Sequence, residues 1–114
     1  MEKPINVFEK PQFKTDAVNK VALIKTDDIG ADVYYFHSGQ VLDYHKHKTD
    51  QVFFILKGEG IFSLDDGTKA ESFPVQAGAI VLAPNGVWHK LENTGKDELV
   101  AAQATKLPTD LQQR

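Results

Sequence analysis

The chain has 114 residues, of which 41% are hydrophobic and 25% charged, and its formal net charge is −3. This length suits one compact domain and leaves no room for a second one with its own core. The positive charge is almost all lysine, Arg114 being the single arginine, so we expect no nucleic-acid partner. The sequence contains no cysteine, which excludes disulfides, thiolate metal sites and cysteine nucleophiles.

Targeting and membrane signals are missing from the sequence. The longest apolar runs, such as residues 52–56, are far shorter than the roughly 20 residues that span a bilayer. Residues 1–4 lack the apolar stretch of a secretory signal. We therefore expect no membrane contact and a cytoplasmic location. The expected partner is a small molecule.

The first 20 residues are expected to form an irregular arm, because Pro4 and Pro11 interrupt any helix. A short edge strand fits residues 5–8. At the other end, residues 106–114 are expected to form a tail, either as one helical turn after Pro108 or as a frayed end.

Between the arm and the tail, residues 21–105 alternate short β-rich runs with turn residues, which is typical of an all-β sandwich or barrel. The pair Asp66-Gly67 is a hairpin signal between two such runs. The expected strands are 21–25, 32–37, 41–47, 51–57, 60–64, 71–76, 79–83, 87–92 and 98–104.

Three histidines and a glutamine stand where strands could bring them together. His45 and His47 are two residues apart in a β-rich run, so their side chains share one face. Gln51 begins the next run, and His89 follows a Pro-Asn-Gly turn. Neutral imidazoles suit zinc, iron, nickel, copper or manganese ions. Alone, however, a His-x-His pair is also common on protein surfaces.

The spacing around these residues carries a family resemblance. Gly39 is followed after five residues by His45-x-His47, then after three by Gln51 and after six by Gly58. The sequence here resembles the first motif of the cupin superfamily, in which a glutamate usually stands at the position of Gln51.

A second segment is similar to the second cupin motif without a departure. Gly78 is followed after five residues by Pro84-x-Gly86, then after two by His89 and after three by Asn93. Together the two motifs cover residues 39–93, about half of the chain. The resemblance implies a single-domain cupin, a jelly-roll-like conical β-barrel that binds one divalent metal ion inside and pairs as a homodimer.

Carried over position by position, the resemblance makes His45, His47 and His89 the metal ligands, with Gln51 in the place of the family's glutamate. A glutamine is neutral at any pH and cannot take a proton. The ion (zinc, nickel, manganese or iron) would therefore keep its full charge. Gln51 is expected either to bind the ion directly or to hydrogen-bond a water on it.

Counting in steps of two from Gln51 predicts that Phe53 and Ile55 share its inward face and form a pocket wall, although the same positions also fit plain core. Phe62 is a further apolar candidate for this wall, and Gln103 is a polar candidate for the pocket. Asp43 keeps step with His45 and is a candidate acid or base, as is Tyr35.

Three functions remain open from the sequence. The first is an enzyme that uses the metal as a Lewis acid, an isomerase or lyase for a sugar-like or keto substrate. The second is an iron dioxygenase that consumes O₂. The third is a ligand-binding or sensing module without catalysis.

Overall fold

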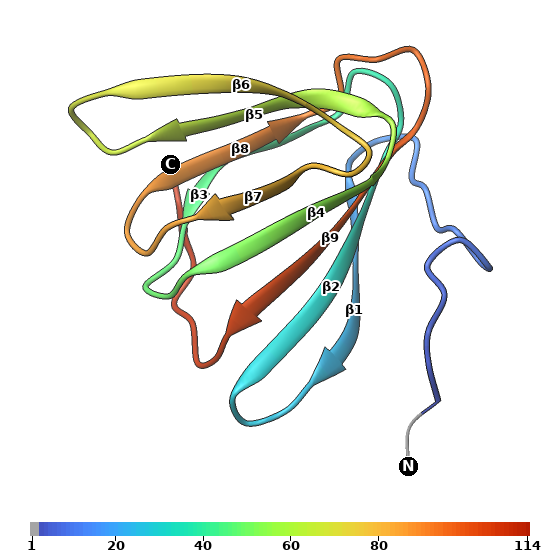
Figure 1. The fold of residues 1–114 in the computed structure, drawn as a ribbon, viewed down its shortest axis with the longest axis horizontal. Coiled ribbons are helices and arrows are strands. Elements are labelled where there is room, and N and C mark those ends of the chain that lie inside the picture. The colour runs from blue at the N-terminus through green and yellow to red at the C-terminus, as the bar shows by residue number, and fades with distance from the viewer. Residues whose placement is uncertain (1–2) are drawn as a thin grey trace.

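The computed structural model describes residues 3–114 as two five-stranded antiparallel sheets that face one another (Figure 1). In spatial order, the first sheet consists of β1 (Asn19–Lys25), β2 (Ile29–Phe36), β9 (Leu99–Lys106), β4 (Gln51–Lys57) and β7 (Ile80–Ala83). The second consists of β10 (Gln112–Gln113), β3 (Val41–Lys46), β8 (Trp88–Glu92), β5 (Glu59–Asp65) and β6 (Ala70–Gln76). The expected all-β fold and its nine main strands are confirmed. Within residues 3–114 no helix is long and apolar enough to cross a membrane.

The core lies between the two sheets, where alternate residues of each strand point inward. Phe36, Phe53 and Phe62 are almost fully buried there, together with Leu91 and Leu99. Burying a large apolar side chain contributes roughly 1.5–3 kcal/mol. These side chains therefore supply much of the free energy that holds the two sheets together.

A second, smaller apolar cluster lies on the outer face of the first sheet. Val7 and Phe13 of the N-terminal arm pack against Val33 and Tyr35 of β2. The arm forms a turn at residues 7–9 and no strand at 5–8, so the expected edge strand is wrong. Its contacts are made by side chains and by the Tyr35 hydroxyl, which donates to the carbonyl of Val7.

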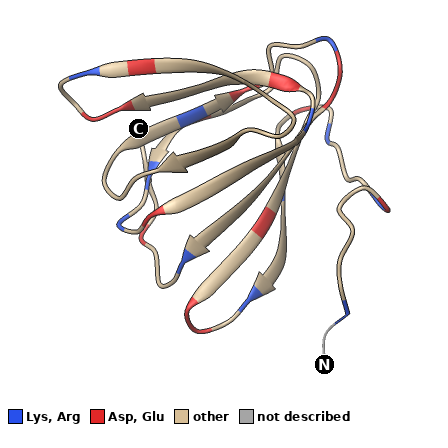
Figure 2. Ribbon diagram, in the orientation of Figure 1, with Lys and Arg blue, Asp and Glu red and all other residues tan. Residues whose placement is uncertain are grey.

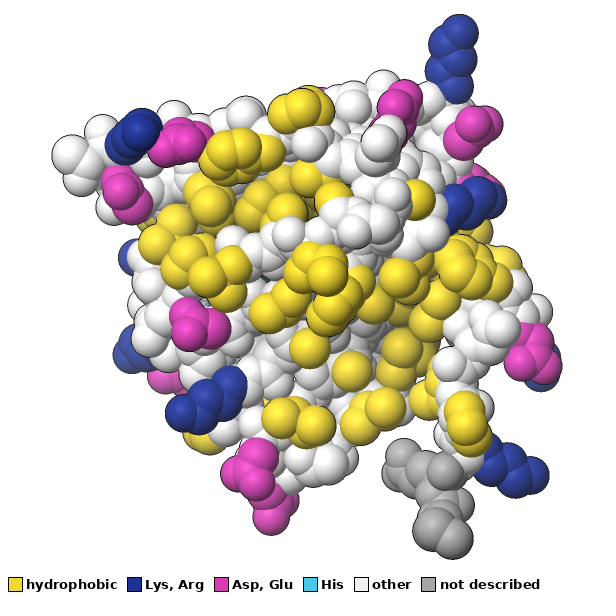
Figure 3. Space-filling model, viewed as in Figure 1, with side chains coloured by type: hydrophobic (Ala, Val, Ile, Leu, Met, Phe, Trp, Pro, Cys, Tyr) yellow, Lys and Arg dark blue, Asp and Glu magenta, His cyan; other side chains and the backbone are white. Residues whose placement is uncertain are grey.

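The rest of that outer face is apolar and exposed. Phe54 and Leu56 of β4 and Ile80 and Leu82 of β7 are all more than a third exposed, and Ile80 reaches 65%. Figure 3 shows hydrophobic side chains gathered over the middle of this face, whereas charged residues of both signs lie mostly at strand ends and turns (Figure 2). Such a patch is typical of a protein-binding surface, and the homodimer stays a prediction.

The tail differs from expectation, because residues 112–113 form a strand rather than a helical turn or a frayed end. β10 pairs with β3, with Gln112 opposite Lys46 and Gln113 opposite His45. Arg114 then pairs with Asp65 at 2.8 Å. An edge strand leaves a row of backbone groups unpaired, and the tail satisfies some of those on β3.

Gly58 joins β4 to β5 with a φ of +86°, and a side chain there would collide with the backbone carbonyl of Glu98. Gly67, in the hairpin between β5 and β6, has a similar φ of +93° but open space around it. A comparison of substitutions at the two positions therefore distinguishes the cost of backbone strain from the cost of a steric collision.

We expect Gly67→Ala to lower the free energy of unfolding by about 1–2 kcal/mol, the usual cost of a left-handed residue. Gly58→Ala should lower it clearly further, by about 3 kcal/mol or more, because the backbone must also move. Urea unfolding of both variants measures this difference. Equal destabilisation would contradict the close packing at Gly58.

Candidate metal centre

Two of the histidines face one another across a strand pair. In the β3–β8 ladder His45 lies directly opposite His89, and their ring centroids are 4.1 Å apart. His47 follows directly after β3, with its ring 5.4 Å from that of His45 and 5.9 Å from that of His89. All three side chains are buried, at 2–8% exposure.

A β-bulge shapes β3 just before the first histidine. The register shifts between Leu42 and His45, so both side chains point inward although they are three residues apart. Asp43 lies within this bulge and lines the same cavity as His45 and His47, so its role as an acid or base stays a prediction. Its exposed carboxylate accepts a hydrogen bond from the backbone N–H of Tyr44 at 2.7 Å.

The histidine nitrogens are arranged as metal ligands require. One ring nitrogen from each of His45, His47 and His89 can be chosen so that all three lie within 4.8 Å of one another. His45 Nδ1 lies 2.8 Å from the carbonyl oxygen of Asp43. A carbonyl only accepts, so Nδ1 carries the proton and Nε2 has a free lone pair.

His47 is oriented in the same way by the tail. Its Nδ1 lies 2.9 Å from the hydroxyl oxygen of Thr109, which leaves Nε2 free for another partner. Metal-binding histidines commonly hold their second nitrogen in such a hydrogen bond, because it fixes the ring and its tautomer.

His89 gives the strongest indication that a metal fits this cluster. The residue is only 2% exposed, and neither of its ring nitrogens has a hydrogen-bond partner among residues 3–114. An unpaired buried polar atom costs about 1–3 kcal/mol. A cation bound between the three imidazoles would remove this cost for His89.

Burial also keeps the cluster neutral. Burial, and secondarily the nearby charge of His45, lowers the pKa of His89 to about 3. Burial together with His45 and Lys20 lowers the pKa of His47 to about 4, and burial lowers that of His45 as well. Near pH 7 all three rings therefore present neutral nitrogens to an ion, without competition from protons.

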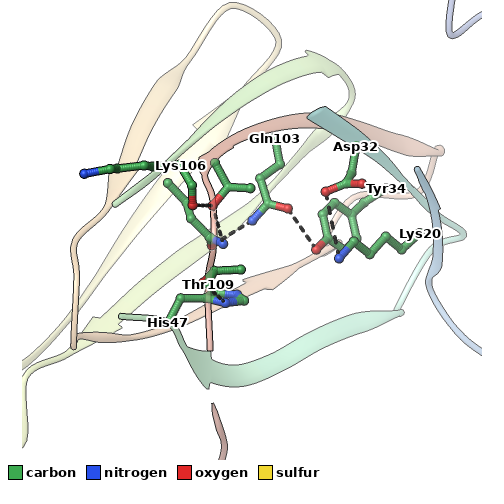
Figure 4. Close-up of polar contacts among 9 residues, drawn as sticks. Lys20, Asp32, Tyr34, His47, Gln103, Lys106 and Thr109 are labelled. Atoms are coloured by element: carbon green, nitrogen blue, oxygen red, sulfur yellow. Dashed lines mark hydrogen bonds and ion pairs between the residues drawn. The ribbon is translucent and has the colours of Figure 1, made fainter. Parts of the chain in front are cut away.

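Gln51 is buried at the start of β4, and both ends of its amide have protein partners. Its oxygen accepts from Gln103 Nε2 at 2.7 Å, and its Nε2 donates to the Thr105 hydroxyl at 3.2 Å (Figure 4). A carbonyl oxygen has two lone pairs, so one is left for an ion or for a water on it. Both roles expected for Gln51 remain compatible with these bonds.

The two histidines of the β3 region open on a cavity of about 390 Å³. Its other walls come from β1, β2, β3 and the C-terminal tail. They are Val18, Lys20, Tyr34, Leu42, Asp43, Tyr44, Leu111, Gln113 and Arg114. The tail thus closes one side of the cavity, and the single arginine is part of its wall.

Several expected site residues lie elsewhere. Phe53, Ile55 and Phe62 belong to the barrel core and do not line the cavity, although the rings of Phe53 and Phe62 lie 5.7 and 6.4 Å from that of His89. Tyr35 faces the N-terminal arm on the outer side of the sheet, and of these two neighbouring tyrosines it is Tyr34 that lines the cavity.

The comparisons with known proteins agree with this architecture. The family model for the cupin domain matches residues 32–102, more than half of the chain. A structure from Klebsiella pneumoniae, of an uncharacterised conserved protein with a double-stranded β-helix domain, superposes with a TM-score of 0.86. That match covers both chains fully at 19% identity, which supports the fold alone.

Two curated relatives match part of the chain. A gentisate 1,2-dioxygenase from Ralstonia is 33% identical over 64 residues, which is 56% of this chain and 17% of that protein. An oxalate-binding protein from Thermotoga maritima is 36% identical over 62 residues, which is 54% of this chain and 48% of that protein. The chain therefore aligns with less than half of either relative.

The hydroxyl of Thr109 generates a prediction about metal affinity. Thr109→Val keeps the shape of the side chain but removes the hydrogen bond to His47, so we expect zinc affinity to fall about tenfold. Titration against a chromophoric chelator measures this. Thr94→Val, at an exposed threonine, is the control and should bind zinc like the wild type. An unchanged affinity for Thr109→Val would show that the tail does not orient His47.

Proposed function

Because the chain belongs to the cupin domain family, we propose that His45, His47 and His89 bind one divalent ion that in turn binds a small organic ligand. The ion would act as a Lewis acid by polarising an oxygen of that ligand. One observation carries the proposal: three buried imidazoles with nitrogens within 4.8 Å of one another, two of them lining a cavity of about 390 Å³.

The proposed ligand set is neutral, which determines the chemistry of the ion. None of the three imidazoles contributes negative charge, and Gln51 is neutral whether it contacts the ion directly or through a water. The ion, which we propose to be zinc, nickel, manganese or iron, keeps its full +2 charge. It therefore attracts ligand oxygens more strongly than it would beside a glutamate.

The missing carboxylate also limits which reactions suit the site. Gln51 cannot serve as a general base, which disfavours reactions that depend on a metal-bound glutamate. An isomerase or lyase that activates a carbonyl or hydroxyl of a sugar-like or keto compound needs only the polarising ion and a nearby proton acceptor. This is the enzyme function that we propose. A binding module without turnover uses the same ion as an anchor.

The proposed metal site has a direct test. The His47→Ala variant should lose most of its bound zinc, because one of the three protein ligands is removed. The matched control is His37→Ala, because His37 lies outside the cluster beside Phe13. Metal analysis after dialysis measures the stoichiometry. Retention of one full equivalent by His47→Ala would contradict the site.

A second candidate function is an iron dioxygenase, which is supported by the similarity to a gentisate 1,2-dioxygenase. Three protein ligands leave coordination positions that O₂ and a substrate could share. This candidate predicts oxygen uptake by the iron-loaded protein with an aromatic or small organic acid. The Lewis-acid proposal predicts turnover without oxygen in the zinc, nickel or manganese form. Activity in anaerobic buffer would exclude the dioxygenase.

A further inference from the structure

A chain of buried hydrogen bonds runs from the cavity into the first sheet. Tyr34 Oη contacts Gln103 Oε1 at 3.1 Å, and Gln103 Nε2 contacts Gln51 Oε1 at 2.7 Å. Gln51 Nε2 contacts the Thr105 hydroxyl, which lies 3.3 Å from the carbonyl oxygen of Lys106 (Figure 4). The members of this chain come from β2, β9 and β4.

The carbonyl at the end of this chain determines which group donates in each of its hydrogen bonds. The carbonyl of Lys106 can only accept, so the Thr105 hydroxyl donates to it and accepts from the amide of Gln51. Gln51 then accepts from Gln103 through its oxygen, and Gln103 accepts from Tyr34. The Tyr34 hydroxyl has therefore committed its only proton to the interior of the barrel.

Tyr34 consequently offers the cavity an acceptor. Its side chain lines the cavity, and the residue is 4% exposed. Burial, and secondarily the charge of Asp32, raises the pKa of Tyr34 well above its ordinary value. The hydroxyl therefore stays protonated at neutral pH, and its remaining lone pairs are available to a donor on a ligand.

Lys20 supplies a positive charge beside this acceptor. It lies opposite Tyr34 in the β1–β2 ladder, with its Nζ 5.9 Å from the centre of the tyrosine ring, and it lines the cavity. Lys20 also forms an ion pair with Asp32, with 3.8 Å between Nζ and Oδ2 (Figure 4). Since this distance is longer than a hydrogen bond, the N–H groups of the ammonium can still donate to the oxygen of a ligand.

The charge balance of the cavity favours an anion. With a divalent ion on the histidines, the charge around the cavity would be positive overall, although the ion pair with Asp32 offsets much of the charge of Lys20. Arg114 also lines the cavity, but it is paired with Asp65 at 2.8 Å. The single acidic residue of the lining is Asp43, whose side chain is exposed.

We propose that the cavity takes a small hydroxycarboxylate, whose carboxylate pairs with Lys20 and whose hydroxyl donates to Tyr34. The inference rests on the proposed function, since the same molecule would contact the metal ion. An acceptor and a cation side by side require a ligand with a donor and an anion in the same relation. A simple carboxylate would offer no donor to the Tyr34 hydroxyl oxygen.

The test uses the 114-residue chain loaded with zinc and three probes of similar size, measured by calorimetric titration. Lactate carries both groups, 2-methoxypropanoate lacks the hydroxyl proton, and lactamide lacks the charge. We expect lactate to bind most tightly and lactamide most weakly. Zinc content is measured separately for every sample.

The first variant removes the charge. Lys20→Met should weaken lactate binding about tenfold or more, as expected for a lost hydrogen bond to a charged group, and should leave zinc content unchanged. The control is Lys25→Met, on the same strand but outside the cavity lining. It should bind lactate like the wild type.

The second variant removes the acceptor. In Tyr34→Phe the preference for lactate over 2-methoxypropanoate should shrink about three- to tenfold, the size of one neutral hydrogen bond. The ratio of the lactate and 2-methoxypropanoate affinities is compared between the variant and the wild type. Because the metal contributes to binding in both proteins, a difference between the two ratios reports the contribution of Tyr34. A melting curve verifies that the Tyr34→Phe variant is folded. The comparison of Lys20→Met with Lys25→Met does not depend on the folding of that variant.

Two results would overturn the inference while leaving the metal site intact. One is zinc-loaded protein that binds lactamide as tightly as lactate, or binds neither. The other is equal lactate affinity in Lys20→Met and Lys25→Met. Protein that binds no zinc would instead contradict the proposed function itself.

Discussion

The structure depends on burying three imidazoles together in the wall of an apolar barrel. The pairing of β3 with β8 places His45 opposite His89, and the rings of Phe53 and Phe62 hold His89 from the other side. Unpaired nitrogens in such a place cost about 1–3 kcal/mol each. A partner that binds the nitrogens would offset this cost. A metal ion is the partner that fits three converging lone pairs best.

The same burial controls charge, ligand binding and reactivity. Desolvation lowers the pKa of each histidine, so the site is ready for a cation at neutral pH. Because Gln51 adds no charge, the positive charge of an ion is not balanced by the protein. An incoming anion would balance it. In the proposed site, a neutral amide in place of a carboxylate would favour electrostatic attraction of a ligand over proton transfer.

Much of this was predictable from local patterns. Short β-rich runs and turn residues define the strands, and the spacing of Gly39, His45 and His47 identifies the family. These features depend on residues that are near one another in sequence. Which face a strand presents depends instead on distant contacts, and one bulge changes it. The bulge after Leu42 puts Leu42 and His45 on the same face although they are three residues apart, and it carries no sequence signal of its own.

The choice between Tyr34 and Tyr35 shows the same limit. Adjacent residues of a strand point to opposite faces, and both tyrosines are buried, at 4% and 3% exposure. The N-terminal arm covers the outer one, and hydrophobic pattern alone cannot distinguish a core from a covered outer face. The position of Lys20 at the cavity was likewise not predictable from the sequence, because it depends on the pairing of Lys20 with Tyr34 between β1 and β2.

The C-terminal tail links the stability of one end of the chain to the metal site. Many of its contacts lie near the surface: the short strand β10, the ion pairs of Asp110 with Lys48 and of Arg114 with Asp65, and the hydrogen bond of Thr109 to His47. Segments with few buried contacts open at small free energies. If the docked tail orients His47 for an ion, the bound ion must favour the docked tail by the same free energy. The cavity that the tail closes is therefore most complete when the metal site is filled.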